Sequence, residues 1–170
     1  MGIDPGITGG LAYIGQDGTV DVRDMPVFDD GLSDKPRKTK SGRKKSTTSG
    51  RQPDPYVIGD LIRLWQPSAI YIEKVRAMPK HGQREGTTSM FNFGTSAGVV
   101  FGAAGALGVP VWFVEAPRWK RDQGLIGKTK DASRLLAIKK YPRVASNLKR
   151  KKDNGRAEAL LIADFGVTKQ

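Results

Sequence analysis

The chain has 170 residues, and its 29 Lys and Arg against 17 Asp and Glu give a net charge of +12. This length fits a single domain with its own core, and the positive charge favours a polyanionic partner such as a nucleic acid. The absence of cysteine excludes disulfides and cysteine-based zinc sites, and a single histidine, His81, excludes histidine-rich metal sites. Any catalytic metal must then be bound mainly by oxygen, which favours Mg²⁺ or Mn²⁺.

The N-terminal segment predicts an antiparallel meander of three strands. Residues 2–14, GIDPGITGGLAYI, are typical of two strands joined by a tight turn, because Pro5-Gly6 and Gly9-Gly10 favour turns. A second turn over 15–18 leads into TVDVRDMPV, residues 19–27, which is expected to form the third strand. The chain runs directly into this strand-like pattern and shows no signal peptide.

A basic insertion is expected at about 30–53. Its segment 35–51 carries eight basic residues, no acid and no large apolar side chain. Such a segment cannot bury anything, so it is expected to be a solvated and flexible loop. The net charge favours a phosphate-binding arm, and the alternative is a solubilising or localisation-like patch.

The rest of the chain alternates between helical and strand patterns. Helices are predicted over 54–66, 96–107, 131–142 and 156–166, buried strands over 68–75 and 109–117, and polar loops over 76–94 and 147–155. Pro67 ends the first helix. The uncharged stretch 97–114 is long enough to cross a bilayer, but Gly108–Pro110 interrupts it, which favours a helix followed by a strand and no membrane.

The order of elements predicts one α/β domain over residues 1–170. Its mixed five-stranded sheet combines the antiparallel meander with parallel strands and is flanked by helices.

Three acids are expected to meet at one end of this sheet. Asp4 ends the first strand and Glu73 the fourth, and in a mixed sheet those ends can lie side by side. Glu158 shares a face of the last helix with Leu161 and Ile162, which indicates that it points toward the sheet. Three inward carboxylates are costly unless a cation neutralises them, so the pattern predicts a site for two divalent metal ions.

A fourth ligand is expected from Asp153, five residues before Glu158. On one helix this offset separates the two by about 140°, so Asp153 fits better in the loop just before the helix. Asp164 is the competing candidate, and its offset from Glu158 favours a surface position.

Each of the three converging acids also has a purely structural alternative. These alternatives are a turn cap for Asp4, an ion pair of Glu73 with Lys74 or another basic neighbour, and an ion pair of Glu158 with Arg156 or Lys152.

Four stretches together resemble the RuvC-type Holliday-junction resolvases: GIDPGITGG, IYIEKV, GTSAGVVFGAAGALGVPVWFVEAPRWK and DNGRAEALLIADFG. The resemblance covers nearly the whole chain except the basic insertion. GRAEALLIA and RWK…GLIGKTKDASR look closer to the plastid branch and its bacterial and phage relatives. The resemblance implies an RNase H-like fold, a homodimer, and Mg²⁺-dependent paired nicking of four-way junctions, with two ions per active site and Mn²⁺ able to substitute.

The resemblance also assigns roles to residues. The metal-ligand positions fall on Asp4, Glu73, Asp153 and Glu158. Lys130 matches a lysine near the scissile phosphate, with a surface lysine as the alternative. Bacterial members often carry an acid or His three residues before the final acid, where this chain has Gly155, and their final acid is more usually Asp.

DNA contacts are expected from two groups of residues. The loop after Glu73, where related resolvases place junction-wedging side chains, offers Met78, Lys80, His81, Arg84 and Phe91. Phosphate contacts are expected from Arg118, Lys120, Arg121, Lys128, Lys149, Arg150, Lys151, Lys152 and Arg156. Phe91 either stacks on DNA or packs in the core, and His81 is not required as a base because metal ions can generate the nucleophile.

The helix over 96–107 is the expected dimer interface, because Gly98, Gly102 and Gly105 allow close helix contact. The alternative is that these glycines pack against the sheet of their own chain. The competing functions are a nuclease of this fold that acts on RNA or simple duplex DNA, a non-cutting junction-binding protein, and an actin-like nucleotide binder. The expected location is intracellular, with DNA, in a bacterial or phage-host nucleoid or in a plastid.

Overall fold

The computed structural model describes residues 1–29, 51–74 and 87–169. Most of the basic insertion and most of the loop after Glu73 lie outside this part of the chain. The same holds for four of the predicted DNA-binding residues, Met78, Lys80, His81 and Arg84.

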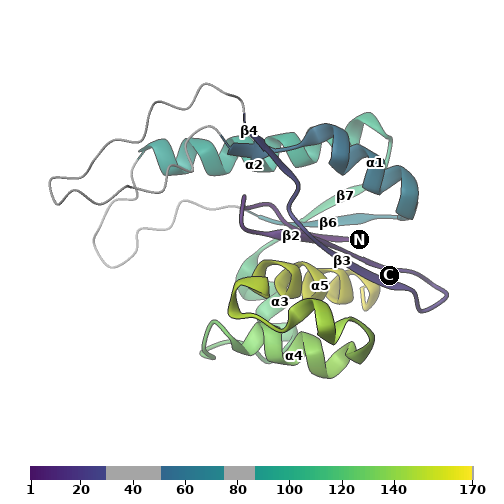
Figure 1. Ribbon diagram of the computed structural model, residues 1–170, viewed down its shortest axis with the longest axis vertical. Coiled ribbons are helices and arrows are strands. Elements are labelled where there is room, and N and C mark those ends of the chain that lie inside the picture. Colours follow the sequence, from purple (N-terminus) through teal and green to yellow (C-terminus); the bar gives the residue numbers. More distant parts are fainter. Residues whose placement is uncertain (30–50, 75–86, 170) are drawn as a thin grey trace, which may run out of the picture.

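A five-stranded mixed sheet lies between two helical layers (Figure 1). Strands β1 (Gly2–Asp4), β2 (Gly10–Ile14) and β3 (Val20–Asp24) form the antiparallel meander. Strands β6 (Ile70–Glu73) and β7 (Val111–Val114) extend it in parallel, in the order β3-β2-β1-β6-β7. The predicted fold class is confirmed.

A second, two-stranded sheet pairs β4 (Val27–Asp29) with β5 (Arg51–Pro53), at the two ends of the basic insertion. The sequence predicted one strand over 19–27, but pairing with β2 ends at Asp24. Pro26 has no N–H to donate, so the ladder cannot continue through it.

One helical layer consists of α1 (Pro55–Trp65) and α2 (Thr87–Ala106). The side chain of Asp54 caps α1 by accepting from the backbone N–H groups of Tyr56 and Val57. Helix α2 begins nine residues before the predicted start at 96. Its polar start looked like a loop, but the Thr95 and Ser96 hydroxyls donate to carbonyls four residues earlier, so they bond to the helix itself.

The other layer holds α3 (Ala116–Asp122), α4 (Ala132–Lys140) and α5 (Asn154–Val167). Two short 3₁₀ segments, η1 (Pro142–Leu148) and η2 (Lys151–Asp153), connect α4 to α5. The sequence missed α3, which starts at the end of the predicted strand. Helix α5 is almost entirely buried and packs along β1 and β2.

Close contact between α5 and the sheet depends on glycine. A Cβ at Gly2 would lie 2.3 Å from the carbonyl oxygen of Ala159, and one at Gly155 would lie 2.4 Å from the carbonyl oxygen of Thr8. No side chain fits in either place. The first turn of α5 is therefore seated directly on the turn that follows Asp4.

In the described residues, no helix is both long and apolar enough to cross a membrane. The uncharged stretch 97–114 forms the second half of α2 and then β7, so the predicted helix followed by a strand is confirmed. The prediction that this strand is buried is wrong, because β7 lies at the edge of the sheet and its Trp112 and Phe113 are 59% and 47% exposed.

Candidate active site

Three carboxylates from three elements face one another at one end of the sheet. Parallel pairing sets Ile3 opposite Ile72, so Asp4 and Glu73, the next residues, end neighbouring strands side by side. Glu158 joins them from the first turns of α5, which Gly155 holds against the β1–β2 turn. The structure thus brings together the three acids that the sequence predicted to converge.

The electrostatics of these acids confirm their proximity. Burial, followed by the charges of Glu73 and Glu158, raises the pKa of Asp4 to about 7. Burial also raises the pKa of Glu73, against a hydrogen bond from Trp119 that lowers it, and the charge of Glu158 adds to the rise. Buried, mutually repelling carboxylates of raised pKa are typical of a functional site.

Three further side chains hold this cluster. The indole Nε1 of Trp119 donates to Glu73 Oε2 at 2.8 Å, and the hydroxyl of Ser133 donates to Glu158 Oε1 at 3.2 Å. Lys120 Nζ lies 3.5 Å from the same oxygen of Glu158, and its charge lowers the pKa of both Asp4 and Glu73. Lys120, predicted as a phosphate contact, is thus the cation within the acid cluster.

The structure also tests the structural alternatives for these acids. Asp4 does cap its turn, because Oδ1 accepts from the backbone N–H of Gly6 at 3.3 Å, so this contact coexists with membership of the cluster. Lys74 lies near Glu115, at 4.0 Å, rather than on Glu73. Glu158 is held by Ser133 and Lys120 rather than by the basic residues considered from the sequence.

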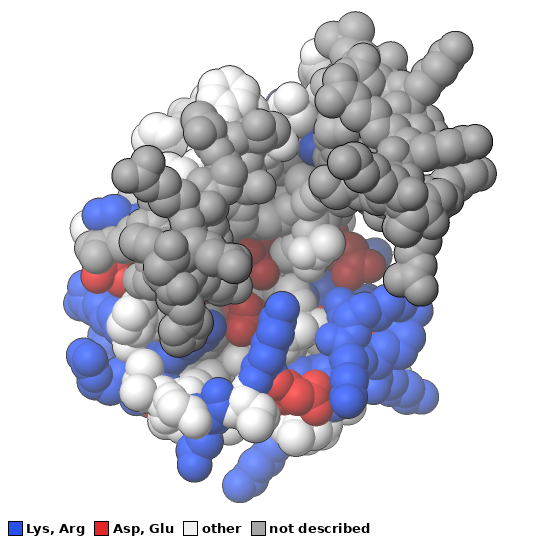
Figure 2. All heavy atoms as spheres, turned by 90° about the vertical axis from the view of Figure 1, so that its left-hand side faces the viewer, with Lys and Arg blue, Asp and Glu red and all other residues white. Residues whose placement is uncertain are grey.

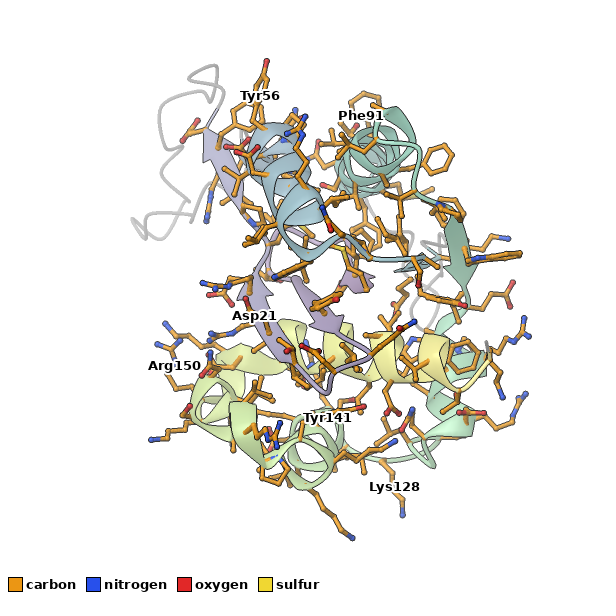
Figure 3. The ribbon with its side chains drawn as sticks, turned by 90° about the vertical axis from the view of Figure 1, so that its right-hand side faces the viewer. Asp21, Tyr56, Phe91, Lys128, Tyr141 and Arg150 are labelled. Atoms are coloured by element: carbon orange, nitrogen blue, oxygen red, sulfur yellow. The ribbon has the colours of Figure 1, made fainter. Side chains whose placement is uncertain are left out.

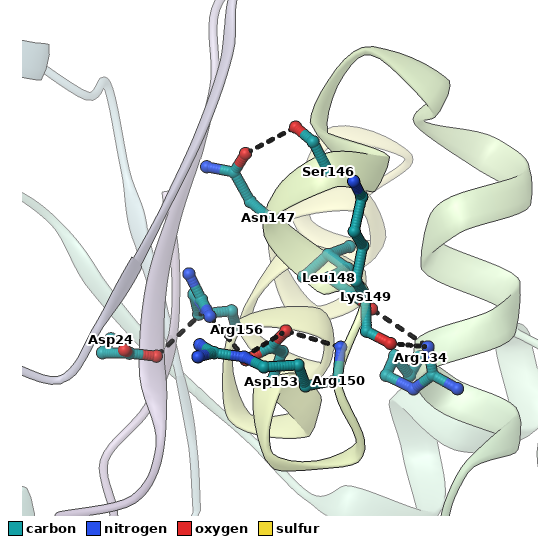
Figure 4. A network of polar contacts seen from close by, with 9 residues as sticks. All are labelled: Asp24, Arg134, Ser146, Asn147, Leu148, Lys149, Arg150, Asp153 and Arg156. Atoms are coloured by element: carbon teal, nitrogen blue, oxygen red, sulfur yellow. Dashed lines mark hydrogen bonds and ion pairs between the residues drawn. The ribbon is translucent and has the colours of Figure 1, made fainter.

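Asp153 is buried and held by arginines (Figure 4). Its Oδ1 accepts from Arg150 Nη2 at 2.9 Å and from Arg156 Nη2 at 2.6 Å, and Arg156 Nε reaches Asp24 at 3.0 Å. Although burial opposes it, hydrogen bonding to Arg150 and then Arg156 lowers the pKa of Asp153 to about 2. The predicted phosphate contact Arg156 is therefore largely buried between two carboxylates.

Asp164 corrects a prediction. The sequence favoured a surface position, but the residue is only 8% exposed and accepts hydrogen bonds from Gln123, Lys140 and Tyr141. Helix α4 packs along α5 and covers this part of it, which periodicity within α5 alone does not reveal. Asp164 does not line the cleft described next.

A cleft of about 540 Å³ opens beside the acid cluster. Asp4, Glu158 and Asp153 line it together with five basic residues, Arg51, Lys130, Arg150, Lys151 and Lys152. Figure 2 shows acidic side chains recessed in the middle of this face, with Lys and Arg on both sides. A larger hollow of about 700 Å³ lies at the other end of the sheet, near Tyr13 and Trp65, and none of these three acids lines it.

The other predicted DNA contacts are exposed. Exposed basic side chains are those of Arg118, Arg121, Lys128, Lys130, Lys149, Arg150, Lys151 and Lys152. Phe91 is 73% exposed, which rules out the alternative of core packing. Phe91 and Lys128 belong to opposite helical layers (Figure 3).

The donor chemistry of the acid cluster fits Mg²⁺, since its free ligands are carboxylate oxygens of excess negative charge. In the described residues, no three carboxylate or histidine side chains are gathered closely enough to hold one ion.

Sequence reasoning missed Trp119 and Ser133. Trp119 is fully buried, and a buried indole N–H needs an acceptor. A tryptophan beside the predicted Lys120, just after a strand end, was the available signal. Ser133 gave none, because its approach to Glu158 depends on how α4 packs on α5.

No family model matches the sequence. The sequence is 39% identical over 98 residues to a Chlamydomonas reinhardtii protein named Holliday junction resolvase MOC1, chloroplastic. This match covers 57% of the chain, which spans only 11% of the length of that curated relative.

The structure is similar to that of Thermus thermophilus RuvC, with a TM-score of 0.55 and 20% identity over 99% of this chain and 95% of that one. A second similar structure is T. thermophilus RuvC in complex with Holliday junction substrate, with a TM-score of 0.53 and 18% identity over 95% and 88% of the two chains. The predicted resemblance and the RNase H-like fold are confirmed.

Proposed function

We propose that this chain is a RuvC-type Holliday-junction resolvase, an endodeoxyribonuclease that resolves four-way DNA junctions by paired symmetric nicks. The observation that carries the proposal is the cluster of Asp4, Glu73 and Glu158 at one end of a RuvC-like sheet. The name of the curated relative and the junction bound to the similar RuvC structure support the substrate. Such an enzyme acts with DNA inside a cell, in a nucleoid or a plastid.

We infer two Mg²⁺ ions per site, with Mn²⁺ able to substitute. When bound, the ions would supply a water of lowered pKa as nucleophile and stabilise the leaving 3′ oxygen. Asp4, Glu73 and Glu158 would hold the ions, because their carboxylates interact at the same end of the sheet. Asp153 lines the same cleft and remains the proposed fourth ligand, although arginines occupy its oxygens in this structure.

Two lysines offset negative charge at the reacting phosphate. Lys120 lies among the carboxylates, and Lys130 lines the cleft with a solvent-exposed side chain. A cation beside the developing charge favours the transition state over the ground state. The exposed side chains of Lys149, Lys151 and Lys152 would bind backbone phosphates.

The test is Asp4→Asn, assayed on a synthetic four-way junction with and without Mg²⁺. This variant should bind the junction with unchanged affinity and lose metal-dependent nicking, because the amide removes an anionic ligand of the metal ions. Normal cleavage by the variant would refute the acid site. If the wild type cut linear duplex as fast as junctions, the chain would be a general nuclease rather than a resolvase. If it bound junctions without cutting them, it would be a non-cutting junction-binding protein.

We further propose that α2 forms a homodimer interface, which suits the approximate two-fold symmetry of a junction. At Gly94, Gly98, Gly102 and Gly105, an added Cβ would have no atom within 4 Å, so these glycines do not pack against their own sheet. Phe101 and Phe113, which contact each other, are 48% and 47% exposed beside them.

Gly102→Leu tests the interface, since the added side chain clashes only with a partner. The variant should sediment as a folded monomer and nick junctions without pairing the cuts. Leu64→Glu on α1, where the wild-type side chain is exposed, is the matched control and should leave the oligomeric state unchanged. A monomeric wild type, or a dimeric Gly102→Leu, would refute the interface.

We also propose that the basic insertion is a phosphate-binding arm. Deletion of residues 35–51 removes eight basic residues and should flatten the dependence of junction affinity on salt concentration. Metal-dependent nicking at low salt should persist. An unchanged slope would reject the arm.

A further inference from the structure

Trp119 touches two members of the acid site with two different parts of one ring. Its Nε1–H donates to Glu73 Oε2 at 2.8 Å, and its ring centroid lies 5.0 Å from Lys120 Nζ. That ammonium group lies 3.5 Å from Glu158 Oε1. One side chain therefore links an acid at the end of β6 with a cation that reaches the acid on α5.

The two contacts match the charge distribution of an indole. The N–H edge carries partial positive charge and binds a carboxylate, and the ring face carries partial negative charge and attracts an ammonium group. Both contacts are made by side chains that are at least partly buried, since Trp119 is fully buried and Glu73 and Lys120 are partly buried. The ring thus presents its positive edge to the carboxylate of Glu73 and its negative face to the ammonium group of Lys120.

The ring itself is fixed by packing. Trp119 is fully buried in the core cluster that α3 shares with α5, where Leu161 and Phe165 belong to the same cluster. Glu73, in contrast, is only partly buried, and the terminal torsion of a glutamate has a broad preference. A rigid donor on one oxygen restricts that torsion and leaves the other oxygen, Oε1, for a ligand.

We propose that Trp119 is a positioning residue that orients Glu73 through its N–H edge and seats Lys120 on its ring face. The proposal rests on the proposed function, in which Glu73 binds a divalent ion. Groups that orient a metal ligand in this way typically change metal affinity when they are removed.

Trp119→Phe separates the two contacts, because phenylalanine keeps an aromatic face and loses the N–H. Mn²⁺ binding to the DNA-free protein, followed by electron paramagnetic resonance, should weaken by about 10-fold or more, while junction affinity stays unchanged. Trp65→Phe is the matched control, since Trp65 is also buried but lies in the other core cluster. A folded Trp119→Phe with the Mn²⁺ affinity of the control would overturn the proposal.

A second measurement needs no change at Trp119, in case its replacement prevents folding. In ¹⁵N-labelled protein, Glu73→Gln should shift the indole N–H resonance of Trp119 more than those of Trp65 and Trp112. Mg²⁺ added to the wild type should shift the same resonance. If neither Mg²⁺ nor Glu73→Gln shifts the indole N–H resonance of Trp119, the proposal fails.

These outcomes are independent of the reaction. If the wild type binds Mn²⁺ through Glu73 but does not nick junctions, the proposed function fails and the role of Trp119 stands. If nicking occurs and Trp119→Phe leaves Mn²⁺ affinity intact, only the role of Trp119 fails.

Discussion

Helix α5 carries Glu158 near its start and Asp164 near its end, and the two acids lie in opposite kinds of surroundings. Asp164 accepts from Lys140, Tyr141 and Gln123, which outweigh burial and lower its pKa. Glu158 instead faces Asp4 and Glu73, whose pKa values are raised. Breaking the pairs of Asp164 would destabilise the fold, whereas Glu158, although Lys120 and Ser133 contact it, belongs to a group of acids with raised pKa values, which is a candidate for chemistry.

Asp153 resembles Asp164 in its contacts, because arginines bind its carboxylate. It resembles Glu158 in its position, because it lines the same cleft. The comparison therefore makes different predictions for stability and for activity at each acid. The predictions below run from the largest expected effect to the smallest.

The largest contrast is in catalysis. Glu73→Gln and Glu158→Gln should each lower Mg²⁺-dependent nicking by more than about 100-fold, since loss of a ligand should exceed the 10–100-fold cost of losing a group that only orients one. Asp164→Asn, on the same helix as Glu158, should leave the rate of nicking by folded protein within a few-fold. Single-turnover assays at matched junction occupancy would measure this. An equal loss of nicking in Asp164→Asn would contradict the distinction between the acid cluster and the paired Asp164.

The next contrast is in stability. Asp153→Asn leaves the buried guanidinium of Arg156 with a weaker partner and should lower the free energy of unfolding by about 3 kcal/mol, as breaking a buried pair does. The exposed pair of Asp60 with Arg63 has the same i,i+3 spacing, so Asp60→Asn should shift the melting temperature by less than about 2 °C. Thermal denaturation with and without Mn²⁺ separates the roles. If Asp153→Asn binds Mn²⁺ like the wild type, Asp153 is not the fourth ligand.

The smallest effect, taken per pH unit, is the dependence of stability on pH without divalent metal. The pKa of Asp4 rises from 3.8 to about 7 on folding, so the folded state holds more protons than the unfolded state between these values. The free energy of unfolding should therefore fall as pH rises through this window, by up to about 1.4 kcal/mol for each pH unit. Asp4→Asn should flatten the fall. Melting curves in a chelating buffer from pH 4 to 8 would test it, and parallel curves for the two proteins would contradict it.

Sequence patterns predicted the sheet, most helices and the three converging acids, because these follow from local periodicity and from the ends of parallel strands. They failed where packing between elements decides. Asp164 is covered by α4, and α2 continues through a polar stretch, residues 87–94, that local sequence assigned to a loop. The arginine contacts of Asp153 likewise depend on the 3₁₀ segment η2, which looked like a basic loop.

The contact of Gly155 with the Thr8 carbonyl also limits which residues position 155 can hold. The resemblance would place an acid or His there, yet even a methyl group would lie 2.4 Å from the Thr8 carbonyl oxygen. Any such substitution would push α5 away from the turn that follows Asp4 and so separate Glu158 from its neighbours. An acid at 155 is therefore incompatible with this seating of α5 unless the turn at 8–9 changes as well.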